Sequence, residues 1–180
     1  PLANWRVLTN EDINTLNSTI TVFVRDPKSR FISGVNTYLQ HVKRDHPDFD
    51  DKTILWFVDN YLFLNRHYCP QFFWLVNLSR YINPEVRLRF EDFKRVADIT
   101  PFNSNAGIAK PTENFLAEIE QFDWHRLELY FYLDQLLVDR IGQELTFGEI
   151  MSIVQTQAPE VYNLIFKKSI QLIDNVLSTT

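Results

Sequence analysis

The clearest helical pattern in the chain runs through residues 27–44, whose sequence is PKSRFISGVNTYLQHVKR. Apolar residues recur there at steps of one and three positions, a spacing that lines one face of an α-helix. These residues are Phe31, Ile32, Val35, Tyr38, Leu39 and Val42. Pro27 stands in the first turn, where a proline costs little because the N–H groups have no partner within the helix. We expect an amphipathic helix over this segment.

The segment before this helix allows two interpretations. From Thr9, a suitable N-cap, to Arg25 the apolar residues keep a helical spacing. Residues 19–24, however, read TITVFV, and β-branched residues with weakly alternating polarity suit a short strand. Helix and strand therefore both stay open for residues 19–24.

Further helices are expected in the middle of the chain. Two strongly apolar ones, near residues 52–64 and 70–82, have few polar sides and belong at the centre of the fold. Asn83-Pro84 ends the second of these and opens an amphipathic helix. Its inward side chains would be Val86, Phe90, Phe93, Val96 and Ala97, with Arg87, Arg89, Lys94 and Arg95 mostly outward.

The C-terminal part of the sequence shows helical patterns with recognisable ends. A long aromatic-rich helix is expected over residues 124–141, with Gly142 at its end. Thr146 and Glu149 have the spacing of a reciprocal capping box, so another helix should begin there. A last helix should follow Pro159.

The longest run of turn-forming residues, 100–111, divides the chain. We expect an all-α fold, a single domain of eight or nine helices in two packed halves with no substantial sheet. Residues 1–98 would form a net basic N-terminal half and residues 112–180 a net acidic C-terminal half. Residues 99–111 would connect them as a loop.

Charge and cysteine content exclude several classes of protein. The net charge is −5, with +2 on residues 1–90 and −7 on residues 91–180. An overall negative charge opposes a sequence-independent grip on phosphate backbones, so we do not expect nucleic acid as the main partner. No stretch approaches the ~18 consecutive apolar residues of a membrane span. The single Cys69 can form no internal disulfide, which favours a cytoplasmic location.

Metal-binding patterns are weak in this sequence. His41 and His46 lie among several aspartates, but they are five positions apart and not the three or four that place two ligands on one helical face. The nearby carboxylates, Asp45, Asp48, Asp50 and Asp51, suit helix caps and a turn. His125 and Glu128 reverse the Glu-x-x-His order of di-iron bundles. We therefore assign no metal ligands.

Patterns for catalysis and cofactors are also weak. Cys69 follows His67 by two positions, and residues two apart do not face each other on a helix. A buried, inert thiol is the better interpretation. The four glycines are isolated and form no phosphate-binding loop. The sequence favours a non-enzyme without a cofactor, although a site assembled from distant residues would escape this reasoning.

Two groups of opposite charge and a surplus of aromatic rings indicate surfaces for interaction. The basic group is Arg80, Arg87, Arg89, Lys94 and Arg95. The acidic group includes Glu118, Glu120, Asp123 and Asp134. They could pair within one molecule or between molecules. Aromatic residues make up 14% of the chain, more than one face of each helix can hide. We expect a non-catalytic protein–protein interaction module, an adaptor, regulator or assembly component, whose partner is another protein or a second copy.

Two other functions remain as alternatives. Residues 144–170 could form a helix-turn-helix for DNA binding, although its turn lacks glycine and acidic residues surround it. The residues that would reach the DNA are Tyr162, Asn163, Lys167 and Lys168. The aromatic rings could instead line a pocket for an apolar ligand or pigment, with His67 or His125 as an axial ligand.

Overall fold

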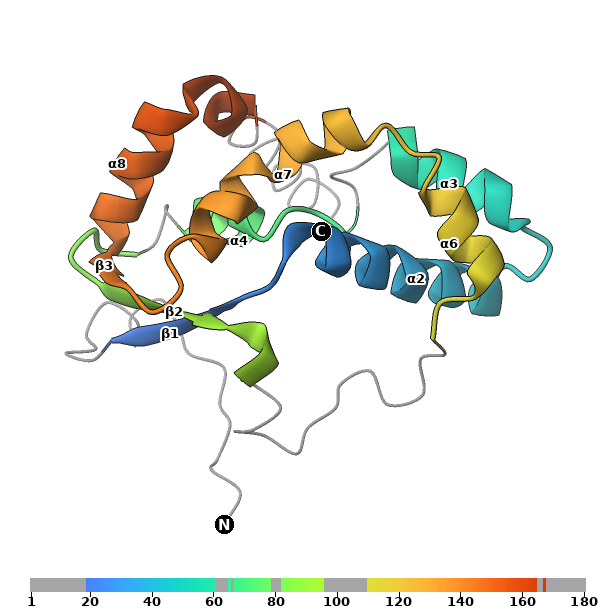
Figure 1. Cartoon of the computed structure of the whole chain (residues 1–180), viewed down its shortest axis with the longest axis horizontal. Helices are drawn as coiled ribbons and strands as arrows, with labels where there is room; N and C mark the ends of the chain where they lie inside the picture. The colour runs from blue at the N-terminus through green and yellow to red at the C-terminus, as the bar shows by residue number, and fades with distance from the viewer. Residues whose placement is uncertain are drawn as a thin grey trace, which may run out of the picture.

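The computed structural model describes residues 19–60, 65, 67–78, 82–95, 110–164 and 167. Within these ranges the chain is mostly helical and carries a small three-stranded sheet (Figure 1). The helices are α2 (Pro27–Asp45), α3 (Asp51–Asn60), α4 (Phe72–Leu78), α6 (Glu113–Ile119), α7 (Trp124–Val138), α8 (Phe147–Gln157) and the 3-10 helix η1 (Phe93–Arg95). The strands are β1 (Ile20–Val24), β2 (Arg87–Asp92) and β3 (Glu144–Thr146). The expectation of an all-α fold without a substantial sheet is therefore wrong.

The sheet joins segments that lie far apart in the sequence. Its strand order is β1-β2-β3, with β1 parallel to β2 and β2 antiparallel to β3. Val22 lies opposite Phe90, and Leu88 lies opposite Leu145. For residues 20–24 the strand is the correct alternative, while residues 9–18 of the expected first helix lie outside the described part of the chain.

The expected helix after Pro84 is wrong, because residues 87–92 form the central strand. Leu88 and Phe90 are buried, whereas Arg87 and Arg89 are exposed, so burial alternates with a period of two over residues 87–90. The apolar positions 86 and 90 fit a helix and a strand equally well, and Leu88 between them distinguishes the two. Residues 93–95 continue as the short helix η1.

The helix expected over residues 27–44 is confirmed as α2. Asp26 is its N-cap, and its carboxylate accepts a hydrogen bond from the backbone N–H of Ser29 at 2.7 Å. Gly34 lies against the chain at His67, where a Cβ on the glycine would overlap the His67 carbonyl oxygen. A glycine at position 34 thus allows α2 to pack closely on the segment that leads to α4.

The C-terminal helices begin where they are predicted to begin, although α7 ends before the predicted residue 141. The long helix α7 begins at Trp124 and ends at Val138, and Gly142 follows it with a φ of 83° in the turn to β3. The capping box at the start of α8 is present in both directions: Thr146 accepts from Glu149, and Glu149 accepts from Thr146. Residues 159–164 are helical after a break at Ala158.

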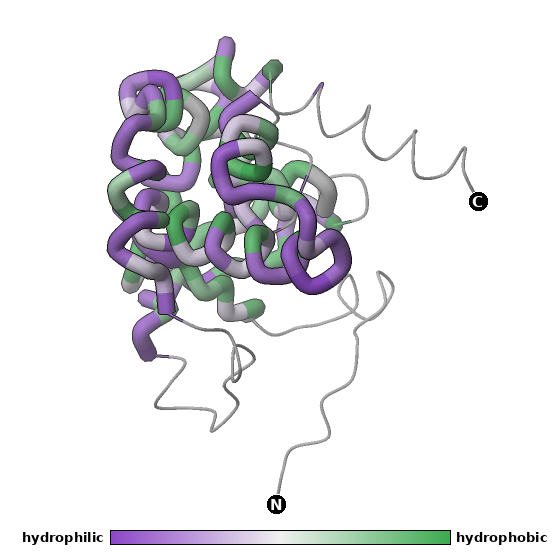
Figure 2. The backbone as a smooth tube through the Cα atoms, turned by 90° about the vertical axis from the view of Figure 1, so that its right-hand side faces the viewer, coloured by the Kyte–Doolittle hydropathy of each residue, from purple (hydrophilic) through white to green (hydrophobic). Residues whose placement is uncertain are grey.

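One core joins the N-terminal and C-terminal segments. Phe31 of α2 is fully buried and lies edge-on to four rings. These are Tyr68, Phe122, Trp124 and Phe131, at centroid distances of 5.5–6.3 Å. In Figure 2 hydrophilic and hydrophobic stretches alternate along the helical turns, as in amphipathic helices that each bury one face. None of the helices in the described ranges is long and apolar enough to cross a membrane.

Candidate functional site

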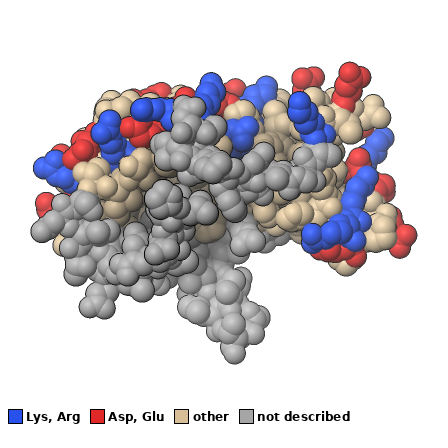
Figure 3. Space-filling view, turned by 90° about the horizontal axis from the view of Figure 1, so that it is seen from below, with Lys and Arg blue, Asp and Glu red and all other residues tan. Residues whose placement is uncertain are grey.

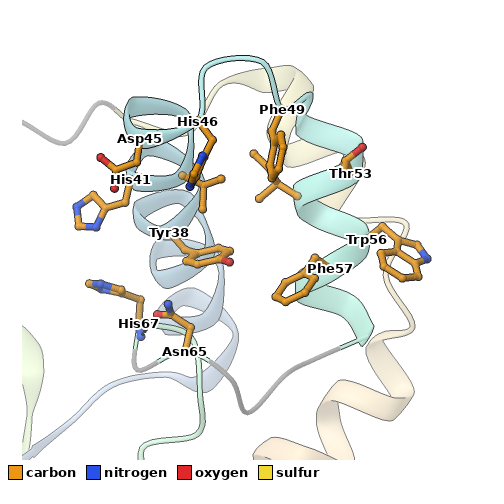
Figure 4. A pocket seen from close by; sticks show the side chains of 12 residues that line it. Tyr38, His41, Asp45, His46, Phe49, Thr53, Trp56, Phe57, Asn65 and His67 are labelled. Carbon is orange, nitrogen blue, oxygen red and sulfur yellow. Dashed lines mark hydrogen bonds between the residues drawn. The ribbon is translucent and has the colours of Figure 1, made fainter. Parts of the chain in front are cut away.

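An aromatic groove of about 440 Å³ lies between α2 and α3 (Figure 4). We call it the α2–α3 groove. Tyr38 and His41 line it from α2, and Phe57 and Trp56 line it from α3. In Figure 4 the rings of Tyr38 and Phe57 project into the space between the helices, and Phe49 lies above them in the connecting loop. The groove therefore has an apolar floor formed by two helices and the loop between them.

Two rings at the rim of this groove are strongly exposed. Phe49 is 50% exposed and Trp56 is 61% exposed, which places both among the most exposed large hydrophobic residues described. His46 stacks on Phe49 with ring centroids 5.4 Å apart. Exposed aromatic side chains beside a groove are typical of interaction sites, and tryptophan is enriched at binding hot spots.

The loop that carries Phe49 is fixed at both ends. Lys43 of α2 forms an ion pair with Asp51 at the start of α3. Asp50 accepts hydrogen bonds from the backbone N–H of Thr53 at 2.8 Å and from its hydroxyl at 3.1 Å, as an N-cap does. The hydrogen bond from the Thr53 backbone N–H is the main reason that the pKa of Asp50 is lowered. Asp50 therefore carries its negative charge at neutral pH beside the exposed Phe49.

Three of the four histidines of the chain line the α2–α3 groove: His41, His46 and His67. His41 and His67 meet edge-on, with ring centroids 5.3 Å apart. No group of three histidine, cysteine or carboxylate side chains that could hold a metal ion occurs among the residues described. Of the two histidines considered as axial ligands, His67 lies in this groove and His125 is exposed on α7.

Cys69 and Asp134 occupy buried positions near the start of α4. Burial raises the pKa of the Cys69 thiol to about 11, which disfavours the nucleophilic thiolate. Asp134 is fully buried, and its carboxylate accepts from the backbone N–H groups of Gln71 and Phe72 at 2.7 and 2.8 Å. Burial is also the main cause that raises the pKa of Asp134. Asp134 thus contributes to the core and not to an exposed acidic surface.

The basic group is divided between the sheet and η1. Arg87 and Arg89 extend from the exposed face of β2, and Lys94 and Arg95 lie on η1, while Arg80 falls outside the described residues. Its three described arginines form ion pairs with two nearby carboxylates. The ion pairs are Arg87–Glu144 at 3.0 Å, Arg89–Glu91 at 2.8 Å and Arg95–Glu91 at 2.5 Å.

The acidic group does not form one surface with the basic group. Glu118 lies in α6, Glu120 caps its C-terminal end, and Asp123 caps α7 by accepting from the Arg126 backbone N–H at 3.1 Å. Within the described ranges, none of these carboxylates pairs with the basic group. Over the described part of the face seen in Figure 3, cationic and anionic side chains are interspersed.

The residues expected at a DNA-binding helix are only partly placed for that role. Asn163 and Lys167 are exposed in the segment after α8, whereas Lys168 lies outside the residues described. Tyr162 is half-buried and its ring lies 6.5 Å from that of Phe72. Tyr162 therefore packs on the core and does not project from this helix.

Sequence reasoning considered His41 and His46 as metal ligands and the aspartates as metal ligands or helix caps, and it did not identify the groove. The signal that it missed was the short connection between two helices, which makes them antiparallel neighbours, together with the aromatic residues Phe49 in the connection and Trp56 in the second helix. No family model matches the chain, and no curated protein or solved structure matches it either.

Proposed function

We propose that this chain is a non-catalytic protein-interaction module that binds an amphipathic helix of a partner protein in the α2–α3 groove. The observation that carries the proposal is the exposure of Phe49 and Trp56 at the rim of a groove of about 440 Å³. Covering these rings with apolar side chains of a partner would release the water that now contacts them.

A helix suits this groove better than an extended segment does. The floor is made by the facing sides of α2 and α3, with Tyr38 and Phe57 between them. Binding of an amphipathic helix in a groove between helices uses apolar anchors at steps of three and four positions. The partner would place such anchors against Phe49 and Trp56.

The charges at one end of the groove favour a basic partner. Lys43 and Arg44 are already paired with Asp51 and Asp45. Asp50 keeps its charge, and the neighbouring Asp48 is exposed. The surplus of negative charge at this loop would attract lysine or arginine at one end of the partner helix.

We also propose a cytoplasmic location for the chain. It has a single cysteine, which can form no disulfide within the chain, and this suits a reducing compartment. In this location the partner would be another intracellular protein.

Site-specific photo-crosslinking in the native cell tests the proposal. A benzophenone amino acid replaces Trp56 in one variant and Leu129 of α7, which is 54% exposed, in the control variant. We expect one discrete adduct from position 56, joined to an amphipathic basic helix of another protein, and no such adduct from position 129.

Three outcomes would contradict the proposal. The first is the same set of adducts from both positions, and the second is no adduct from position 56. The third is an adduct to a small molecule, which would favour a ligand-binding protein. An adduct to a second copy of the chain would indicate that the groove mediates self-association and does not bind another protein.

A further inference from the structure

A second groove, of about 490 Å³, runs beside β1. We call it the β1 groove. Residues 21–25 line it together with Arg30 of α2 and Trp74 of α4. The two grooves share His67 as a lining residue. Because all five consecutive residues 21–25 border this space, it follows the edge of the strand and not only one face of the sheet.

The hydrogen bonds of β2 show which backbone groups of β1 point toward this groove. The N–H of Phe90 donates to Gln143 at 3.1 Å, and its carbonyl accepts from Gly142 at 2.8 Å, so Phe90 faces β3. Backbone groups alternate in direction along a strand, so Arg89 and Glu91 face β1. In a parallel pair these two residues bond to the positions on either side of their partners in register.

The partners in register are Thr21 for Arg89 and Phe23 for Glu91. The ladder with β2 therefore uses the backbone groups of residues 20, 22 and 24. The N–H and carbonyl groups of Thr21 and Phe23 point to the opposite edge, toward the β1 groove.

The side chain of Gln71 supports this direction independently. Its Oε1 accepts from the backbone N–H of Arg25 at 3.0 Å, and its Nε2 donates to the Arg25 carbonyl at 2.9 Å. The Gln71 amide thus takes the place of a neighbouring strand at residue 25. Arg25 lies two positions after Phe23 and four after Thr21, so the backbone groups of all three point to the same edge. Within the described ranges no strand pairs with this edge of β1.

Among the described residues that line the β1 groove, two are arginines and none is a carboxylate, although the whole chain has a net charge of −5. Arg25 and Arg30 are among its lining residues, and Arg30 also donates to the carbonyl of Cys69. Trp74 and Phe93 line it as well, and they are 45% and 46% exposed. The groove therefore combines main-chain donors and acceptors with positive charge and exposed rings.

We propose that the β1 groove binds an extended acidic segment of a partner protein, which adds to β1 as a fourth strand. Main-chain hydrogen bonds to Thr21 and Phe23 supply the affinity in this mode, and alternate side chains supply the specificity. Acidic side chains of the segment lie toward Arg25 and Arg30, and apolar ones lie toward Trp74 and Phe93. This inference goes beyond the proposed function because it concerns another surface and a partner of opposite charge.

Amide hydrogen exchange, measured residue by residue by NMR on the full chain, tests the proposal. The probe is a synthetic hexapeptide of alternating valine and glutamate, and the control peptide alternates valine and lysine. We expect the first peptide, at millimolar concentration, to slow exchange of the Thr21 and Phe23 amides, and the second to leave them unchanged. Arg25→Glu should weaken binding of the glutamate peptide by about fivefold or more.

A proline scan supplies the matched variants. Thr21→Pro removes an N–H that points to the groove, so the chain should fold and lose binding. Val22→Pro removes an N–H that bonds to β2, so this variant should lower the melting temperature much more. Thermal denaturation of both variants separates loss of binding from loss of the fold.

Other outcomes would overturn the proposal. If neither peptide protects Thr21 or Phe23, or if both do so equally, an acidic segment is not the occupant. If the Thr21 and Phe23 amides are protected without any peptide, at every concentration of the chain, another segment of the same chain covers this edge. If protection of these amides without peptide increases with the concentration of the chain, a second copy of the chain covers the edge.

Discussion

Asp134 of α7 accepts a hydrogen bond from the backbone N–H of Phe72 at 2.8 Å, across a separation of 62 positions in the sequence. Its other oxygen accepts from the N–H of Gln71 at 2.7 Å. A buried carboxylate on one helix thus satisfies the first free N–H groups of α4, which would otherwise lack partners. This contact ties the start of α4 to the middle of α7.

Replacing Asp134 with asparagine should destabilise the fold. The amide offers one oxygen acceptor in place of two, so one of the N–H groups of Gln71 and Phe72 loses its partner in the core. We expect the free energy of unfolding to fall by about 1–3 kcal/mol, measured by urea denaturation. The exposed Asp139→Asn serves as the control and should change it by less than about 0.5 kcal/mol. Equal losses from the two variants would contradict the buried contact.

The Cys69 thiol should make the fold less stable in alkali. Its pKa rises from the ordinary 9.0 to about 11 through burial. Between about pH 9 and pH 11 the unfolded chain releases this proton while the folded chain keeps it, so the free energy of unfolding falls as the pH rises. The loss from this group is at most about 2–3 kcal/mol.

Cys69→Ala removes this contribution. We expect the free energy of unfolding of the wild type to exceed that of the variant by less and less as the pH rises from about 8.5 to about 11. Urea denaturation at each pH measures this difference. Tyr68 also has a pKa raised mainly by burial, and this main cause is common to both proteins. A difference that stays constant over this range would show that the thiol is accessible to water.

Gly34→Ala should weaken the contact between α2 and the segment at His67. The added methyl group meets the His67 carbonyl oxygen, which is backbone and cannot move aside as a side chain can. We expect a loss of about 1–3 kcal/mol, as for other overpacked positions, measured by thermal denaturation. Gly148→Ala provides a comparison, since its nearest neighbour is a Pro84 side-chain atom at 3.2 Å. A melting temperature lowered no more by Gly34→Ala than by Gly148→Ala would refute the close packing.

Burial along β2 can be checked with two neighbouring substitutions. Leu88 is 2% exposed and faces the core, so Leu88→Ala should cost about 2–5 kcal/mol of stability. Arg89 lies on the other face of the strand, so Arg89→Ala should cost less than about 1 kcal/mol. Urea denaturation of both variants gives the comparison. Similar losses would be at odds with a strand whose faces alternate.

The parts of the fold that sequence patterns predicted correctly are those governed by local interactions. The helix over residues 27–44 is long and keeps one apolar face, and α2 covers it. The capping box of Thr146 and Glu149 is a contact between near neighbours, and it lies at the predicted start of α8. Both features need only the spacing of residues within one segment.

The errors concern features that depend on distant segments. Residues 87–92 form a strand because β1 and β3 lie on either side of them, and their short apolar pattern does not by itself exclude a helix. The carboxylate of Asp134 is buried because the start of α4 supplies its donors. The α2–α3 groove likewise depends on how two helices and their loop pack, so no local motif marks it.

The dissociation constant of the partner captured from position 56 tests the central claim most directly. We expect Trp56→Ala to raise it at least about tenfold, while Leu129→Ala, at a similarly exposed apolar position, changes it less than about twofold. Such a result would identify the α2–α3 groove as the docking site. Equal effects of the two substitutions, or no effect of Trp56→Ala, would contradict the account.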